Sequence, residues 1–89
     1  MSAVKKLQQQ FGVVVRRRRE AVGLSQESLA DQSQLHRTYI SLLERGLRMP
    51  TILVAKRIAE ALGTTMTDLL GEVERGLIQR SPSKKRASS

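Results

Sequence analysis

The sequence predicts a small all-α domain of five helices. Apolar residues recur at helical spacing without strand-like alternation, and residues that favour helix starts and helix ends punctuate the chain. The length of 89 residues allows one small domain. With 39% hydrophobic residues but only one Phe and one Tyr, the core should consist of aliphatic side chains.

Two serines mark the starts of the first two helices. Ser2 is suited to cap a helix that ends at Gly23, and Ser25 is suited to cap the segment "QESLADQ". In the second helix, Leu29 and Ala30 should face inward. The apolar positions of the first helix are Leu7, Phe11, Val14, Val15 and Val22.

The third and fourth helices follow the short turn "SQL". In "RTYISLLER", Ile40 and Leu43 lie three residues apart and should face inward, and Gly46 is placed to end the helix. Thr51 then begins the helix "ILVAKRIAEALG", which Gly63 terminates.

A capping-box pattern and a basic tail complete the chain. Thr65 and Asp68 resemble a capping box ahead of "LLGEVERGLI", the fifth helix. The tail contains Pro, Ser and basic residues without large apolar ones, which predicts disorder. We therefore divide the chain into a basic extension of the first helix (1–10), a folded domain (11–78) and a disordered basic tail (79–89).

Charge is the strongest compositional signal. The formal net charge is +8: residues 1–19 carry six basic and no acidic groups, residues 20–79 carry six basic and eight acidic groups, and residues 80–89 carry four basic groups. Basic flanks suit a polyanionic partner, although they are also found on proteins that merely need to stay soluble. The run "RRRR", Arg16 to Arg19, winds almost a full turn and should form mostly a charged collar rather than face one phosphate strand.

Residue counts argue against several classes of function. With no Cys and one His, neither a disulfide nor a metal site is expected, and no nucleophile, base and orienting group can be assembled for catalysis. The longest purely aliphatic run is "ILVA", so no membrane span is predicted. We expect a cytoplasmic protein that is not an enzyme and that binds neither a cofactor nor a small-molecule ligand.

Two short helices joined by a turn of three or four residues define a helix-turn-helix unit. Residues 26–45 fit this description. The motifs "FGVVVRRRREAVGLSQESLA", "RTYISLLERG", "PT" and "IAEALGTTMTDLL" together resemble the lambda-repressor-like, Cro/CI (XRE-type) helix-turn-helix regulators from Phe11 to about Leu70. Within that family, "RTYIS" with "ERG" is most similar to controller proteins of restriction-modification systems. Two positions depart from the family pattern: Gln34 replaces the usual Gly or Asn of the turn, and His36 replaces the usual capping residue.

The resemblance implies a compact five-helix lambda-repressor-like domain whose third helix enters the major groove of double-stranded DNA, amino end first. Arg37 and Thr38 would read bases there, and an arginine fork matches guanine O6 and N7. The alternative for each residue is that its side chain is simply exposed to solvent at the end of the helix. The full set implied to contact DNA is Gln26, His36, Arg37, Thr38, Tyr39, Ser41, Arg45 and Arg48.

The resemblance also implies an internal ion pair and a homodimer. Arg19 and Glu44 would join the first helix to the third. Two copies would bind a roughly palindromic operator, because one third helix reads only a few base pairs. The apolar width of the last helix places the dimer surface at Leu69, Leu70, Val73 and Leu77; the alternative is that this helix simply closes the monomer. The alternatives are an antitoxin-type protein that also binds a toxin, and a non-specific cationic nucleic-acid binder.

Overall fold

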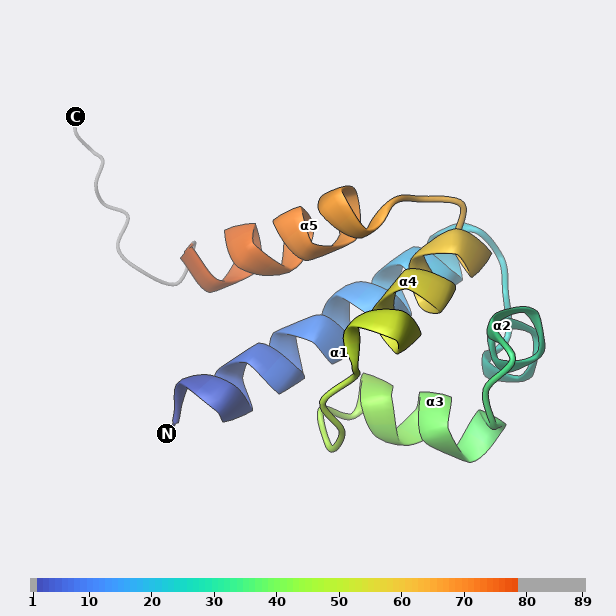
Figure 1. The fold of residues 1–89 in the computed structure, drawn as a ribbon, viewed down its shortest axis with the longest axis horizontal. Helices are drawn as coiled ribbons and strands as arrows, with labels where there is room; N and C mark the ends of the chain where they lie inside the picture. Colours follow the sequence, from blue (N-terminus) through green and yellow to red (C-terminus); the bar gives the residue numbers. More distant parts are fainter. Residues whose placement is uncertain (1, 79–89) are drawn as a thin grey trace.

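The structure, a computed structural model, describes residues 2–78. It contains five α-helices in this range and no strand, which confirms the all-α prediction (Figure 1). The predicted basic tail, residues 79–89, lies outside the described residues. The helices are α1 (Ala3–Ala21), α2 (Gln26–Ser33), α3 (Arg37–Glu44), α4 (Ile52–Ala61) and α5 (Met66–Ile78).

Hydroxyl caps begin four of the five helices, as the sequence predicts. The side chains of Ser2, Ser25, Thr51 and Thr65 each accept a hydrogen bond from the backbone N–H three residues later, at 3.0–3.1 Å. Each bond satisfies one of the amide groups that a helix start leaves without a partner. Local sequence therefore fixes where these four helices begin.

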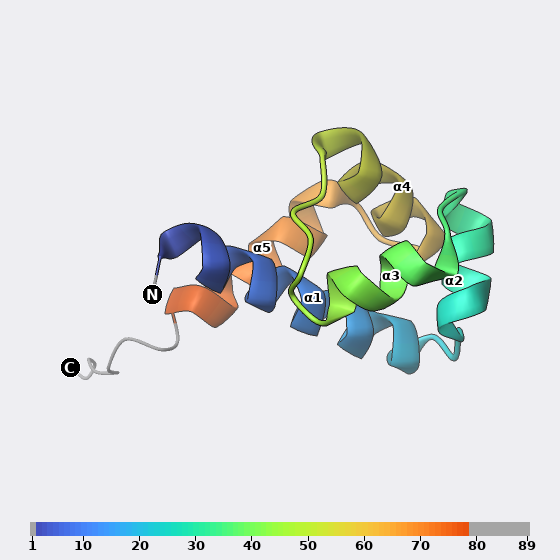
Figure 2. The ribbon, with the colours of Figure 1, turned by 90° about the horizontal axis from the view of Figure 1, so that it is seen from below.

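The helices α1 and α5 run antiparallel and side by side (Figures 1 and 2). Helix α3 packs against both α1 and α2, and α4 bridges α2 and α5. Figure 2 shows α3 beside α1, on which it packs.

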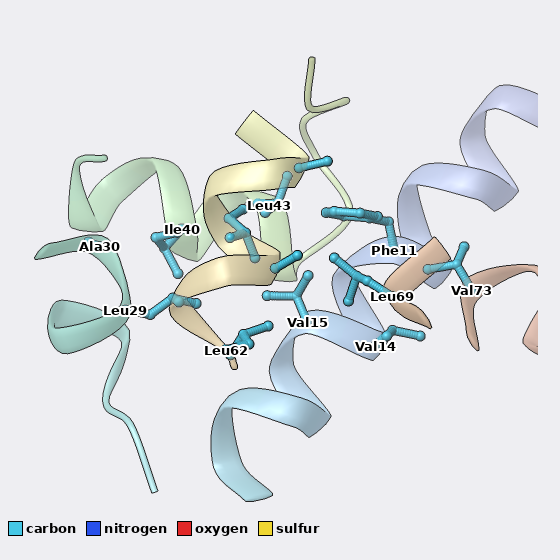
Figure 3. Close-up of a cluster of buried hydrophobic side chains, with 13 residues drawn as sticks. Phe11, Val14, Val15, Leu29, Ala30, Ile40, Leu43, Leu62, Leu69 and Val73 are labelled. Carbon is cyan, nitrogen blue, oxygen red and sulfur yellow. The ribbon is translucent and has the colours of Figure 1, made fainter. Parts of the chain in front are cut away.

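One apolar core, aliphatic apart from Phe11, joins all five helices (Figure 3). Its members include Phe11, Val15, Leu43 and Ile58, all less than 5% exposed. Two of the apolar positions named for the first helix lie outside this core: Leu7, near the start of α1, is 38% exposed, and Val22, the residue after its last turn, is 53% exposed.

The last helix also requires a correction. Leu69 and Val73, expected on the dimer surface, are 0% and 1% exposed and pack inside the single chain. The face of α5 that the sequence offered to a partner is thus partly used to close the monomer. Leu70, at 43% exposed, remains on its outside, and Leu77 is partly exposed.

A glycine sets the distance between α1 and α3. A Cβ atom added at Gly12 would lie 2.4 Å from the carbonyl oxygen of Leu43 and 2.7 Å from that of Glu44. Both contacts are with backbone atoms, so no side-chain rotation would relieve them. Gly12 thus allows the end of α3 to pack directly on the backbone of α1.

The turn between α2 and α3 contains a strained residue. Gln34 adopts φ 62° and ψ 42°, the left-handed region that glycine and asparagine populate most readily. Its backbone N–H still bonds to the carbonyl groups of Ala30 and Asp31, as a helix end requires. The left-handed residue that ends α2 is therefore accommodated with Gln at this position.

Candidate nucleic-acid interface

Helix α3 has one buried side and one open side. Ile40 and Leu43 point into the core and are fully buried (Figure 3). Thr38 and Leu42 lie roughly on the opposite side, because residues four apart stack on one face of a helix. Thr38 is exposed and Leu42 partly exposed. A helix of only eight residues is thus held by its inner face and leaves its outer face free to contact a ligand.

The amino end of α3 is exposed and only weakly capped. His36 occupies the N-cap position, but its side chain makes no capping hydrogen bond. His36, Arg37 and Thr38 are all exposed. The first turn of α3 consequently presents polar side chains together with backbone N–H groups that its N-cap side chain does not satisfy.

The middle of α3 contributes one side chain that packs and one that is partly open. Tyr39 is partly buried and packs against the core. Burial raises the pKa of the Tyr39 phenol, and the positive charge of Arg48 opposes this effect. Tyr39 therefore packs on the core and also lies near a basic group. Ser41 is partly exposed.

Two arginines extend the surface beyond the end of α3. Arg45 is the C-cap residue of α3, and Arg48 follows in the connection to α4. Both are exposed, and Arg48 Nη1 donates to the carbonyl oxygen of Leu47 at 3.2 Å. Neither Arg45 nor Arg48, nor Arg37, forms a salt bridge within residues 2–78.

A buried carboxylate connects three helices beneath this surface. Arg19 Nε on α1 donates to Glu44 Oε2 at 2.6 Å, and Arg19 Nη2 donates to Glu44 Oε1 at 3.1 Å. The hydrogen bond to Glu44 raises the pKa of Arg19, and burial opposes it. Gln26 Nε2, at the start of α2, donates to the same Glu44 Oε1 at 3.0 Å.

This network fixes the orientation of Gln26. An ionised carboxylate only accepts hydrogen bonds, so the amide nitrogen of Gln26 must be the atom that faces Glu44. The second N–H of the amide and the carbonyl oxygen of Gln26 stay available to a ligand. The structure therefore brings the expected pair, Arg19 and Glu44, into contact and attaches Gln26 to it.

The arginine run of α1 is engaged within the chain. Arg16 pairs with Glu20 at 3.2 Å, and Arg17 and Arg18 both pair with Glu72 of α5. Partial burial of the Glu72 carboxyl would raise its pKa, but the hydrogen bonds from Arg17 and Arg18 outweigh this and hold the pKa below its usual range. Glu72 was not singled out from the sequence, because its partners are more than 50 residues away.

An apolar groove lies away from these arginines. It is bordered by Leu7 of α1, Met49 before α4, Ile52 of α4 and Leu70 of α5. Ile52 is 78% exposed. The sequence indicated an apolar surface on α5 alone. The groove could not be predicted, because its residues on α1, α4 and α5 meet only in the folded chain.

Within residues 2–78, no group of three or more His, Asp or Glu side chains is arranged to hold a metal ion. None of the helices in this range has the length and apolar character needed to cross a bilayer.

A model of the helix-turn-helix family matches residues 15–69, which include α2, α3 and α4. The chain belongs to the helix-turn-helix family. It is an XRE-type DNA-binding transcription regulator and not an enzyme, and α3 is the second helix of its helix-turn-helix unit.

Controller proteins are among its relatives. Control protein C.BamHI of Bacillus amyloliquefaciens is 46% identical over 61 residues, covering 67% of this chain and 75% of that protein. Control protein C.MunI of Mycoplasma sp is 40% identical over 58 residues, covering 65% of this chain and 78% of that protein.

A solved structure of the restriction-modification controller protein C.Esp1396I, a tetramer in complex with its natural 35 base-pair operator, has a TM-score of 0.75 to this chain. Its identity to this chain is 30%, and the match covers 81% of this chain and 95% of that one. These similarities confirm the predicted lambda-repressor-like architecture.

Proposed function

We propose that this protein is a restriction-modification controller protein that acts as a homodimer on a two-fold symmetric operator. The observation that carries the proposal is the open face of α3. Arg37 and Arg45, at the two ends of this helix, and Arg48 beyond it are exposed and have no carboxylate partner in the described chain. An arginine that is already paired with a carboxylate has to give up that bond before it can bind DNA, which would weaken the DNA contact. These arginines are available to bases and phosphates instead.

The residues divide into base-reading and backbone-binding groups. Arg37 and Thr38, in the exposed first turn of α3, would enter the major groove, where an arginine fork reads guanine. Arg45 and Arg48 would bind phosphates on one side of the groove, and Gln26, held by Glu44, would bind a phosphate on the other. His36 and Tyr39 would add contacts from their N–H and O–H groups.

Specificity requires two copies of α3. Two-fold symmetric binding places the recognition helices about 34 Å apart, on one face of the duplex. Four exposed side chains that line the apolar groove are suited to the dimer contact, since they are apolar and unused by the core: Leu7, Met49, Ile52 and Leu70. The controller protein on the 35 base-pair operator is itself a tetramer. Such a regulator would act in the cytoplasm of a prokaryotic cell.

The experiment that tests the proposal selects binding sites from randomised duplexes near physiological salt. Wild type should enrich a two-fold symmetric motif, and an Arg37→Ala, Thr38→Ala double variant should keep only weak, salt-sensitive binding. An Arg16→Ala variant, which removes one charge from α1, should enrich the wild-type motif. If no protein enriches a motif, the protein is a non-specific cationic binder and the proposal fails.

The dimer surface is tested separately by sedimentation. Ile52→Glu should give monomers with unchanged helicity, because a charge would be buried in the contact. Val13→Glu, at a side chain 47% exposed on α1 outside the groove, is the matched control and should remain dimeric. If the Ile52→Glu variant still forms dimers, the interface lies on another surface.

A further inference from the structure

Leu42 is an apolar residue on the open face of α3. It stands four residues after Thr38, on the same side of the helix, with Ser41 and Arg45 as polar neighbours. Leu42 is partly exposed, and it is not among the partly buried side chains of residues 2–78 that pack on the core. Its side chain has no hydrogen-bonding group, so it cannot bind a phosphate.

The structure gives Leu42 one other possible role. The N–H of Leu47 donates to the carbonyl oxygen of Leu42 at 2.9 Å, and that of Gly46 donates to Leu43 at 3.0 Å. This pair of bonds is a Schellman motif, which is commonly accompanied by an apolar contact between the residues in the positions of Leu42 and Leu47. Such a contact would stabilise the end of α3 but would not depend on DNA sequence.

The chemistry of the major groove restricts what Leu42 can meet there. The base edges expose donors and acceptors, and the 5-methyl group of thymine is the one apolar feature among them. Leucine pressed against any other edge would leave polar groups desolvated and without a partner. An apolar side chain on this face is therefore favourable only opposite a methyl group.

Resting on the proposed function, we propose that Leu42 is a specificity-determining residue that recognises the 5-methyl group of a thymine in each half-site. Thr38 and Leu42 then form a short stripe on α3, with Arg37 before it and Arg45 after it. Arg37 reads a base and Arg45 binds a phosphate, while Leu42 selects a pyrimidine that carries a methyl group over the three other bases.

Deoxyuridine is the probe, because it removes the methyl group and leaves the base pair intact. The selected operator is synthesised with each thymine position replaced in turn, symmetrically in both half-sites. At one position, wild-type affinity should fall by about fourfold per half-site, the value expected for one buried methyl group. The Leu42→Ala variant should bind operators with thymine and with deoxyuridine at that position with equal affinity.

Leu47→Ala is the matched control. It removes the partner of Leu42 in the Schellman motif and should lower stability, but it should keep the wild-type preference for thymine over deoxyuridine. A second variant, Leu42→Gln, should select a different base at this position alone, since glutamine pairs with adenine N6 and N7. Melting temperatures of all variants establish that they are folded.

The outcomes separate the two proposals. A symmetric motif in which no methyl effect depends on Leu42 overturns the role of Leu42 and leaves the regulator function intact. A methyl effect that Leu47→Ala also abolishes assigns Leu42 to the helix end and overturns its role as a reader. Selection that yields no motif overturns both the function and this inference.

Discussion

The two groups of arginines in this protein differ in what surrounds them. Arg16 to Arg19 form an unbroken run on α1, yet each pairs with a carboxylate of the same chain. Arg37, Arg45 and Arg48 are spread over twelve positions around α3, and within residues 2–78 none of them has a carboxylate partner. The denser group stabilises the fold, and the sparser group is available to DNA.

The comparison shows that charge density along the sequence does not locate a nucleic-acid surface. A guanidinium group already bonded to a carboxylate has to give up that bond before it can bind a phosphate. What decides the role of an arginine is therefore the position of the carboxylates after folding. Glu44 and Glu72 determine which of these arginines are engaged in ion pairs between helices.

The largest effect is expected at the buried pair. Arg19→Met leaves Glu44, whose side chain is 2% exposed, without its cation, and should lower the free energy of unfolding by about 3–5 kcal/mol. Urea denaturation followed by circular dichroism measures this. Adding Glu44→Leu should recover much of the loss, because the double variant no longer buries an unpaired charge. If the single variant is as stable as wild type, the pair is not structural.

The next largest effect is expected on operator affinity, from a change in α3 that should leave stability unchanged. Arg37→Ala should weaken binding to the selected operator by about 1–3 kcal/mol, because it removes a base-reading fork. Fluorescence anisotropy measures the affinity. Equal losses on operator and on random DNA would assign Arg37 to phosphate binding instead.

A smaller effect is expected at Glu72, which bonds two arginines of α1. Glu72→Gln should lower the free energy of unfolding by about 1–2 kcal/mol at neutral pH. The folded-state pKa of Glu72 lies below the unfolded value of about 4.3, so this stabilisation is complete above that pH and is lost as the pH falls through the folded-state pKa. Unfolding curves of both proteins should therefore converge on acidification; a constant difference would contradict the charged contact.

The smallest effect is expected at Arg16. Its ion pair with Glu20 is solvent-exposed and spans one helical turn, so Arg16→Ala should change stability by about 0.3–0.5 kcal/mol. Operator affinity should change by less than about threefold, the screened effect of one distant charge. A loss as large as that of Arg37→Ala would erase the distinction between the two groups of arginines.

The sequence by itself determined the helices and the type of regulator. The hydroxyl caps and apolar spacing act over three or four residues, so Ser25, Thr51 and Thr65 reveal helix starts without any knowledge of the fold. The motif "RTYISLLERG" likewise predicted that Ile40 and Leu43 face inward and leave the polar side of α3 open. The helix-turn-helix match and the relatives confirm the family that these motifs indicated.

Only the tertiary structure decided which charges are paired and which apolar residues are exposed. Arg17 and Glu72 are 55 residues apart, and the spacing along the chain gives no sign of their contact. Leu69 and Val73 read from the sequence as surface positions, but the packing of α5 on α1 buries them, while Ile52 and Met49 remain outside. The physical reason is range: caps and helical periodicity are properties of neighbouring residues, whereas ion pairs and burial depend on distant segments that meet only when the chain folds.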